Sequence, residues 1–105
     1  AKDMILTGRQ VRAEEALAIG LVDEVVAPDA LMARARERAA ELAAGAVVAQ
    51  GLAKRAIDGG LDRTLAEGLT IEQDQFAEVF TTHDAQMGVA TFLEKGAGHA
   101  RFEGR

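Results

Sequence analysis

Few residues of this chain could carry out chemistry, and their spacing builds no familiar catalytic site. The sequence has no Ser, Cys or Tyr, so neither Ser-His-Asp nor Cys-His nucleophilic catalysis can be assembled from it. His83 and His99 have no cysteine and no partner at helical spacing, which gives a metal site little support. Glu14 and Glu15 are adjacent and diverge by about 100° on a helix, so they cannot share one substrate. The residues alone therefore predict no catalytic residue and no metal ligand.

The composition limits the class of protein. A length of 105 residues allows one small domain, and 17 acidic against 12 basic residues, a net charge of −5, argue against a nucleic-acid partner. Hydrophobic residues make up 49% but are largely alanine, and aromatic residues are 4%, so the bulky core is thin and a partner surface is expected. The absence of cysteine fits a reducing cytoplasm, and no apolar run approaches the roughly 20 residues of a membrane span. We therefore expect a cytoplasmic chain with neither a nucleic-acid nor a membrane partner.

The first part of the chain, residues 1–26, is predicted to contain a helix end, a corner and a short strand. Thr7-Gly8 ends an apolar run with the glycine that a helix needs just past its last turn. Glu14-Glu15 lies in the first turn of a second helix, where carboxylates meet the positive end of the helix dipole, and Gly20 ends that helix. The β-rich run Leu21–Val26 follows as a strand. The opening of the chain, Ala1 to Leu6, has no capping residue, which favours a truncated chain.

The remainder is predicted to be helical up to residue 96. Residues 27–60 form a pair of helices, the first from about Pro28 and the second containing Gly51, whose presence inside a helix indicates a close crossing with a neighbour. Residues 61–96 form the C-terminal helices, of which the first starts at the Thr64–Glu67 capping box and the last is capped by Thr81 or Thr82. The tail, residues 97–105, has no periodicity and is expected to be extended or disordered.

Several of these segments together carry a family resemblance. The runs ILTGR, AEEALAIGLVDEVV, LAKRAIDGGLDRTLAEGL and FLEKG resemble the C-terminal part of the enoyl-CoA hydratase/isomerase (crotonase) family in order and spacing, over essentially the whole chain. The resemblance implies a mainly α fold, the helical oligomerisation part of the crotonase fold, with one short β segment. The β-rich spiral core of the family, with its oxyanion hole and catalytic glutamates, precedes such a segment and is expected to be absent from these 105 residues.

The resemblance also implies a function. The parent protein would hydrate a 2-enoyl-CoA or perform a related isomerisation, with the coenzyme A thioester as substrate and no cofactor. The family pattern places CoA contacts at Phe76 and Lys95, although Phe76 also fits an apolar stripe and Lys95 also fits a helix end before Gly96. In the family this segment builds trimers that pair into hexamers; a fragment could instead dimerise. We expect no hydratase activity from this chain alone.

Two other interpretations stay open. The chain could be a stand-alone helical interaction module that self-associates or docks on full-length crotonase relatives, since its helices are amphipathic and its core is thin. It could also be a proteolytic or cloning fragment with no role of its own. Departures from the family pattern at Ala85-Gln86-Met87 and Gly45-Ala46 leave the substrate class open.

Overall fold

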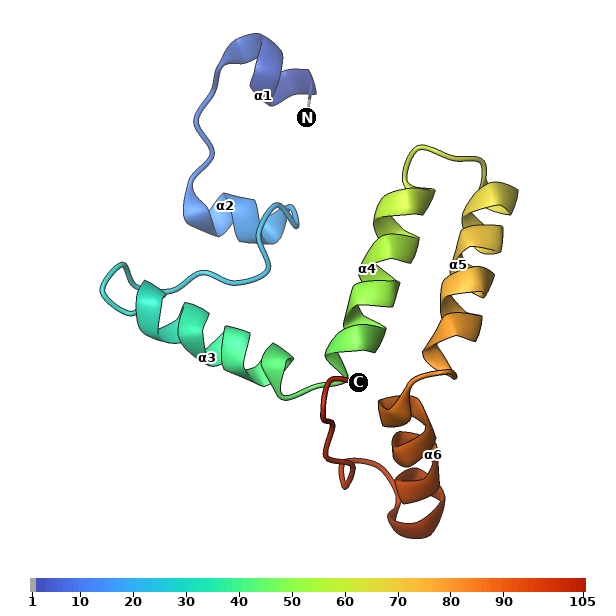
Figure 1. The fold of residues 1–105 in the computed structure, drawn as a ribbon. Coiled ribbons are helices and arrows are strands. Elements are labelled where there is room, and N and C mark those ends of the chain that lie inside the picture. Colours follow the sequence, from blue (N-terminus) through green and yellow to red (C-terminus); the bar gives the residue numbers. More distant parts are fainter. Residues whose placement is uncertain (1) are drawn as a thin grey trace. The chain divides into compact units, whose positions relative to one another are not determined.

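The structure, a computed structural model, describes residues 2–105 and contains helices but no strand within that range (Figure 1). The predicted mainly α fold is therefore confirmed, and only Ala1 of the predicted opening segment lies outside the described residues. The chain divides into two compact units, residues 1–36 and residues 37–105. The helices are α1 (Lys2–Thr7), α2 (Ala13–Ala18), α3 (Leu31–Ala43), α4 (Val47–Gly60), α5 (Leu65–Val79) and α6 (His83–Lys95).

The first unit is held by local interactions at its helix ends. Gly8 has a φ of +63° and follows α1, as predicted, and its N–H donates to the carbonyl of Met4 at 3.0 Å. The guanidinium of Arg9 then bonds the carboxylates of Asp3 at 2.8 Å and Glu15 at 2.7 Å, which ties the end of α1 to α2. Because these side chains are exposed, the ion pairs fix geometry more than they add stability.

The predicted strand Leu21–Val26 is wrong, because the chain turns there instead of extending beside a partner. Gly20, with a φ of +71°, donates to Leu17 at 3.1 Å, and Leu21 donates to Ala16 at 2.8 Å. These two bonds form a Schellman motif that ends α2 and turns the chain across the helix end. β-branched residues favour a strand only where a neighbouring strand pairs with them, and the structure offers none among residues 2–105.

Helices α4 and α5 form an antiparallel hairpin that is the packing centre of the second unit (Figure 1). Leu52 of α4 is the fully buried apolar side chain of this hairpin, at 0% exposure. The close crossing predicted at Gly51 is wrong, since a Cβ placed there would meet nothing within 4 Å. The helices instead converge next to their connecting turn, where a Cβ on Gly60 would lie 3.6 Å from the Cα of Gly68.

The predicted caps are present. The Thr64 hydroxyl accepts the Glu67 N–H at 3.4 Å, and the Glu67 carboxylate accepts the Thr64 N–H at 3.0 Å, which completes the capping box of α5. Thr82 caps α6 by accepting the Ala85 N–H at 3.1 Å, and His83 is the first residue of that helix. Helix α3 begins at Leu31, later than predicted, because residues 28–30 form a turn.

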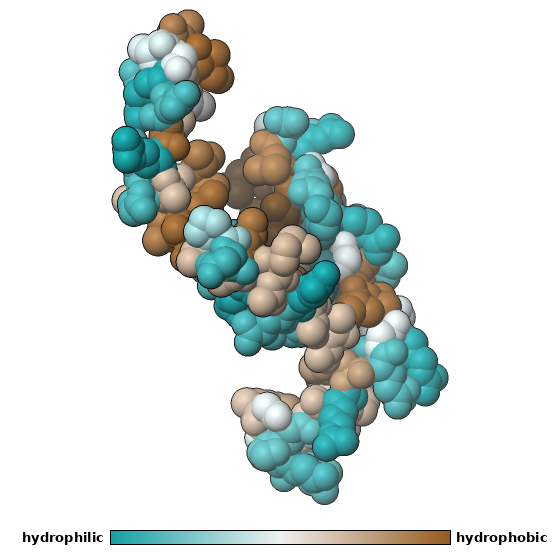
Figure 2. Space-filling model, turned by 90° about the vertical axis from the view of Figure 1, so that its left-hand side faces the viewer, coloured by the Kyte–Doolittle hydropathy of each residue, from teal (hydrophilic) through white to brown (hydrophobic). Residues whose placement is uncertain are grey.

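Much apolar surface stays uncovered. Among residues 2–105 only Ala16 and Leu52 are buried apolar residues, while large hydrophobic side chains are exposed on every helix. On the face drawn in Figure 2, hydrophobic residues lie at the surface among hydrophilic ones. A contiguous exposed apolar surface is typical of proteins that bind a partner or a ligand there.

We predict that Gly51→Ala raises the free energy of unfolding by about 1 kcal/mol, because Ala favours a helix interior and the position is open. Chemical denaturation of the chain would measure the change. Gly96→Ala is the matched control and should destabilise, because Gly96 has a φ of +83°. A loss of stability in Gly51→Ala would contradict the prediction and would indicate that another surface covers Gly51.

We predict that Thr64→Ala lowers the free energy of unfolding by about 1 kcal/mol through loss of the cap. The backbone N–H and hydroxyl of Thr64 hold the pKa of Glu67 below its usual value. The contribution of this carboxylate to stability is therefore present above the ordinary glutamate pKa and is lost as pH falls through the lowered one. Thr70→Ala, which removes a hydroxyl bonded only to Ala66 within α5, is the control and should change little. Equal effects of the two substitutions would contradict the prediction.

Candidate functional site

A groove between α4 and α5 is a concave surface of the second unit. It encloses about 780 Å³ and is lined mostly by apolar side chains of both helices. Its polar lining residues include Arg63, Glu72 and Gln75, and the Gln75 side-chain oxygen accepts from Arg55 of α4 at 3.1 Å. Pockets of this size, apolar with a few polar groups at the edge, are the usual form of a ligand or partner site. The apolar lining includes Leu52, Ala56, Ile57, Leu69, Phe76 and Val79.

Phe76, the predicted aromatic contact, lines this groove. Its side chain is 64% exposed, and its ring packs edge to face on Phe80 with centroids 5.1 Å apart and planes at 80°. The edge-to-face contact orients the Phe76 ring, and the exposure leaves ring surface free for a flat apolar group. The structure therefore places Phe76 in an open groove and not in a closed core, while its ligand stays a prediction.

Lys95, the predicted lysine contact, lies elsewhere. It is the exposed last residue of α6, where its charge complements the negative end of the helix dipole. Gly96 follows with a φ of +83° and donates to the carbonyl of Phe92 at 2.8 Å. Phe76 lines this groove and Lys95 does not. Its role also stays a prediction.

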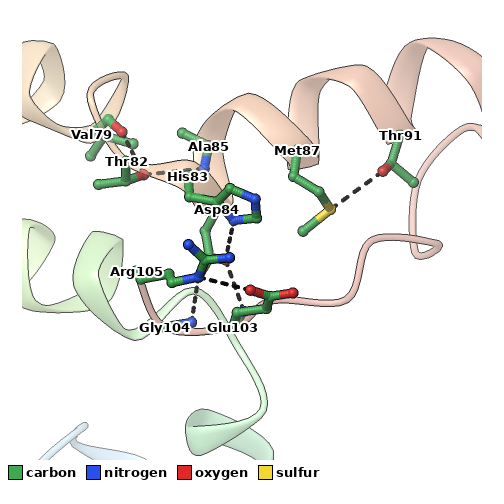
Figure 3. Close-up of polar contacts among 10 residues, drawn as sticks. All are labelled: Val79, Thr82, His83, Asp84, Ala85, Met87, Thr91, Glu103, Gly104 and Arg105. Atoms are coloured by element: carbon green, nitrogen blue, oxygen red, sulfur yellow. Dashed lines mark hydrogen bonds and ion pairs between the residues drawn. The ribbon is translucent and has the colours of Figure 1, made fainter.

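Asp84 makes a long-range contact that sequence reasoning missed. This carboxylate, in the first turn of α6, is 1% exposed and accepts the backbone N–H groups of Glu103 and Gly104, each at 2.8 Å (Figure 3). The Asp84 N–H in turn donates to the Arg105 carbonyl at 2.9 Å. From the sequence, an acid directly after the Thr82 cap is accounted for as a favourable charge at a helix start, and no residue pattern in the tail predicts that the tail returns to it.

The surroundings of Asp84 favour its charged form. The Glu103 N–H lowers the pKa of Asp84; burial opposes this, and the Gly104 and Arg105 backbone groups and the nearby His83 lower it further. His83 is close enough to contribute, with its Nδ1 3.9 Å from the carboxylate. Successive backbone N–H groups around one carboxylate form an anion-holding nest.

Other kinds of site find no support in the part of the chain that the structure describes. Within residues 2–105 no three His, Cys, Asp or Glu side chains gather where they could hold a metal ion. The described helices also include none with the length and apolar character needed to cross a membrane.

Comparison with known proteins gives one consistent family. The sequence model described as enoyl-CoA hydratase/isomerase matches residues 1–105. A putative enoyl-CoA hydratase/isomerase of Bacillus subtilis is 46% identical over 95 residues, which are 90% of this chain and 36% of the relative. A short-chain-enoyl-CoA hydratase of Clostridium acetobutylicum is 40% identical, with 90% of this chain and 36% of the relative covered.

The fold agrees with the sequence comparison. A crystal structure of an enoyl-CoA hydratase from Geobacillus kaustophilus superposes with a TM-score of 0.86 at 33% identity, covering 94% of this chain and 37% of that chain. A second crystal structure from the same organism gives a TM-score of 0.88 at 36% identity, covering 94% and 38%. The chain thus spans little more than a third of the length of these proteins.

Proposed function

Because this chain belongs to the enoyl-CoA hydratase/isomerase family, we propose that it is the C-terminal helical part of a protein that acts on acyl-CoA thioesters. Hydration of a 2-enoyl-CoA is the reaction we assign to the whole protein. The match of the family model over residues 1–105 carries this proposal, and the agreement in fold supports it. This chain spans little more than a third of the relatives' length, so we propose the hydratase activity for the whole protein and not for this segment.

Within that protein we assign this segment binding and assembly, and no catalytic residue. In the family's reaction the thioester oxygen becomes an oxyanion held by two backbone amides, which the resemblance places upstream of the segment. The exposed ring of Phe76 can pack on an adenine or pantetheine group, and the ammonium of Lys95 can pair with a phosphate. The segment thus contributes contacts to the CoA moiety, at a distance from the reacting bond.

The exposed apolar surface supports a role in subunit contacts, with a trimer or hexamer as the expected assembly. The α4–α5 groove and the apolar side chains around it are the surface we assign to this role. The same observation also favours the second candidate, a stand-alone module that self-associates or docks on full-length relatives. The two candidates differ in whether the chain operates as part of a complete enzyme.

We predict that the purified chain does not hydrate crotonyl-CoA, followed as loss of the ultraviolet absorbance of the enoyl thioester. Turnover above that of a heat-inactivated sample would contradict the assignment of catalysis to residues outside the segment. A full-length protein carrying the oxyanion and glutamate motifs together with this segment should be active.

We predict that Lys95→Gln weakens binding of free coenzyme A to the full-length protein by roughly tenfold, the usual effect of losing one charged hydrogen bond. Isothermal titration calorimetry would measure the affinity at two salt concentrations, since a phosphate contact weakens as salt rises. Lys54→Gln is the matched control, because Lys54 is exposed and pairs with Asp58 on the outside of α4. Indistinguishable affinities for wild type, Lys95→Gln and Lys54→Gln would reject the Lys95 contact.

We predict that the chain self-associates at micromolar concentration, which sedimentation velocity would detect. Phe76→Asp and Leu69→Asp, which place charge in the groove, should shift the chain towards monomer. A compact monomer that also fails to bind a dye for exposed apolar surface would contradict both candidate roles.

A further inference from the structure

The C-terminal tail is attached to the start of α6 through the buried Asp84. One oxygen of its carboxylate accepts the Glu103 N–H and the other accepts the Gly104 N–H, both at 2.8 Å, and the Asp84 N–H donates to the Arg105 carbonyl at 2.9 Å (Figure 3). The bonded residues are separated by 19 or more positions in the sequence. This is a tertiary contact that encloses nearly all of α6 in a loop.

Packing on both sides of the tail accompanies these hydrogen bonds. On the α6 side, a Cβ placed on Gly88 would lie 3.3 Å from the ring of Phe102, so the ring rests directly on the helix backbone. On the other side, a Cβ placed on Gly104 would lie 3.0 Å from Cγ2 of Val47, the first residue of α4. The C-terminus lies beside the start of α4 for this reason (Figure 1). The tail therefore joins α6 to α4.

Among the described residues of this unit, few other contacts join α6 to α4 or α5. The α4–α5 pair is the only extensive helix contact among residues 2–105, and α6 has no comparable contact with another described helix. The tail begins at Gly96, directly after Lys95, and is held further along by Asp84, by Phe102 on Gly88 and by Gly104 on Val47. Release at Asp84 would leave only the packing of Phe102 and Gly104 to hold residues 97–105.

We propose that Asp84 is a positioning residue that fastens residues 97–105 across α6 and onto the start of α4, and thereby holds the end of α6 that carries Lys95. The fastening stands on the contacts of Asp84, Phe102 and Gly104. Its consequence for coenzyme A rests on the proposed function of Lys95.

A carboxylate suits this position for a chemical reason. Two backbone N–H groups approach its two oxygens, and an ionised carboxylate accepts on both. An Asn side chain would present one acceptor and one NH₂ donor, so one tail N–H would face another donor. Asp84→Asn therefore removes one hydrogen bond, replaces the charged acceptor of the other with a neutral one, and keeps the size of the side chain.

The test measures hydrogen exchange of the Glu103 and Gly104 amides by NMR in the 105-residue chain. Asp84→Asn should raise exchange at both amides by at least about tenfold and speed tryptic cleavage after Arg101, while the α4 and α5 amides keep their protection. Asp74→Asn, the same change at an exposed position of α5, should alter neither readout. Unprotected tail amides in the wild type, or protection unchanged by Asp84→Asn, would overturn the proposal.

A second variant keeps the test decisive if Asp84→Asn disturbs folding. Gly104→Ala leaves the carboxylate intact but places a Cβ against Val47 at a φ of +77°, so it should release the tail from the α4 side. Tail exchange that stays slow in Gly104→Ala would show that the packing against α4 does not hold the tail, which contradicts the proposal.

Acid should release the tail as well. The Glu103 N–H holds the pKa of Asp84 below its ordinary value, so protection of the tail amides should persist below the ordinary aspartate pKa and be lost as pH falls through the lowered one. The other titratable groups nearby are His83 on α6 and the exposed Glu103–Arg105 pair of the tail itself, 2.8 Å apart. Tail protection that does not change with acid, or an equal acid response in Asp84→Asn, would overturn the role of the carboxylate.

Coenzyme A binding separates the positioning role from the proposed function. In the full-length protein, Asp84→Asn should weaken binding, and the loss should vanish in a Lys95→Gln background, because both changes act through one contact. Unchanged affinity in Asp84→Asn alongside a loss in Lys95→Gln would overturn the positioning role. If Lys95→Gln itself has no effect, the proposed function of Lys95 fails, while the exchange measurements still decide whether Asp84 fastens the tail.

Discussion

The packing of α4 on α5 is the interaction on which the second unit depends. Leu52 becomes fully buried there, and Gly60 and Gly68 allow the two backbones to approach where the hairpin turns. Elsewhere among residues 2–105 few large apolar side chains are fully removed from water, so hydrophobic burial contributes less to ordering the other helices. Helix ends are fixed by hydrogen bonds instead: the Schellman motif after α2, the Thr64–Glu67 capping box of α5 and the Thr82 cap of α6. These caps and turns determine where helices begin and end, but they do not determine how separate helices pack.

Because local hydrogen bonds define the helices while few helices pack on one another, a short, alanine-rich chain can have regular helices and still expose much apolar surface. A helix needs about three turns and a covered apolar face to be stable, and caps add only about 1 kcal/mol each. The faces left open, including the α4–α5 groove with Phe76, therefore require a second surface to gain the stability that burial gives. Membership of a family whose matched relatives are about two and a half times as long fits this need, since 90% of this chain covers only 36% of each relative.

The sequence predicted what is encoded within a few residues and missed what depends on distant ones. Gly8, Gly20 and the Thr64 capping box were predictable because each acts on its own helix end. The strand Leu21–Val26 and the crossing at Gly51 were wrong because both require a neighbour that a propensity cannot supply. For the candidate site, helical spacing put Phe76 on an apolar stripe but could not distinguish a core position from a groove. Its ligand, and that of Lys95, came from resemblance alone.

The contact of Asp84 with the tail also depends on residues that are distant in the sequence, which is why the sequence alone does not predict it. An acid in the first turn of a helix is ordinarily exposed, where the dipole alone accounts for it. A carboxylate at 1% exposure is different, because burying a charge is unfavourable unless hydrogen bonds replace the lost water. The tail N–H groups supply those bonds, and the tail in turn has no other polar partner as well placed among the described residues. Burial of Asp84 and return of the tail therefore require each other, and neither can be deduced from one end of the chain alone.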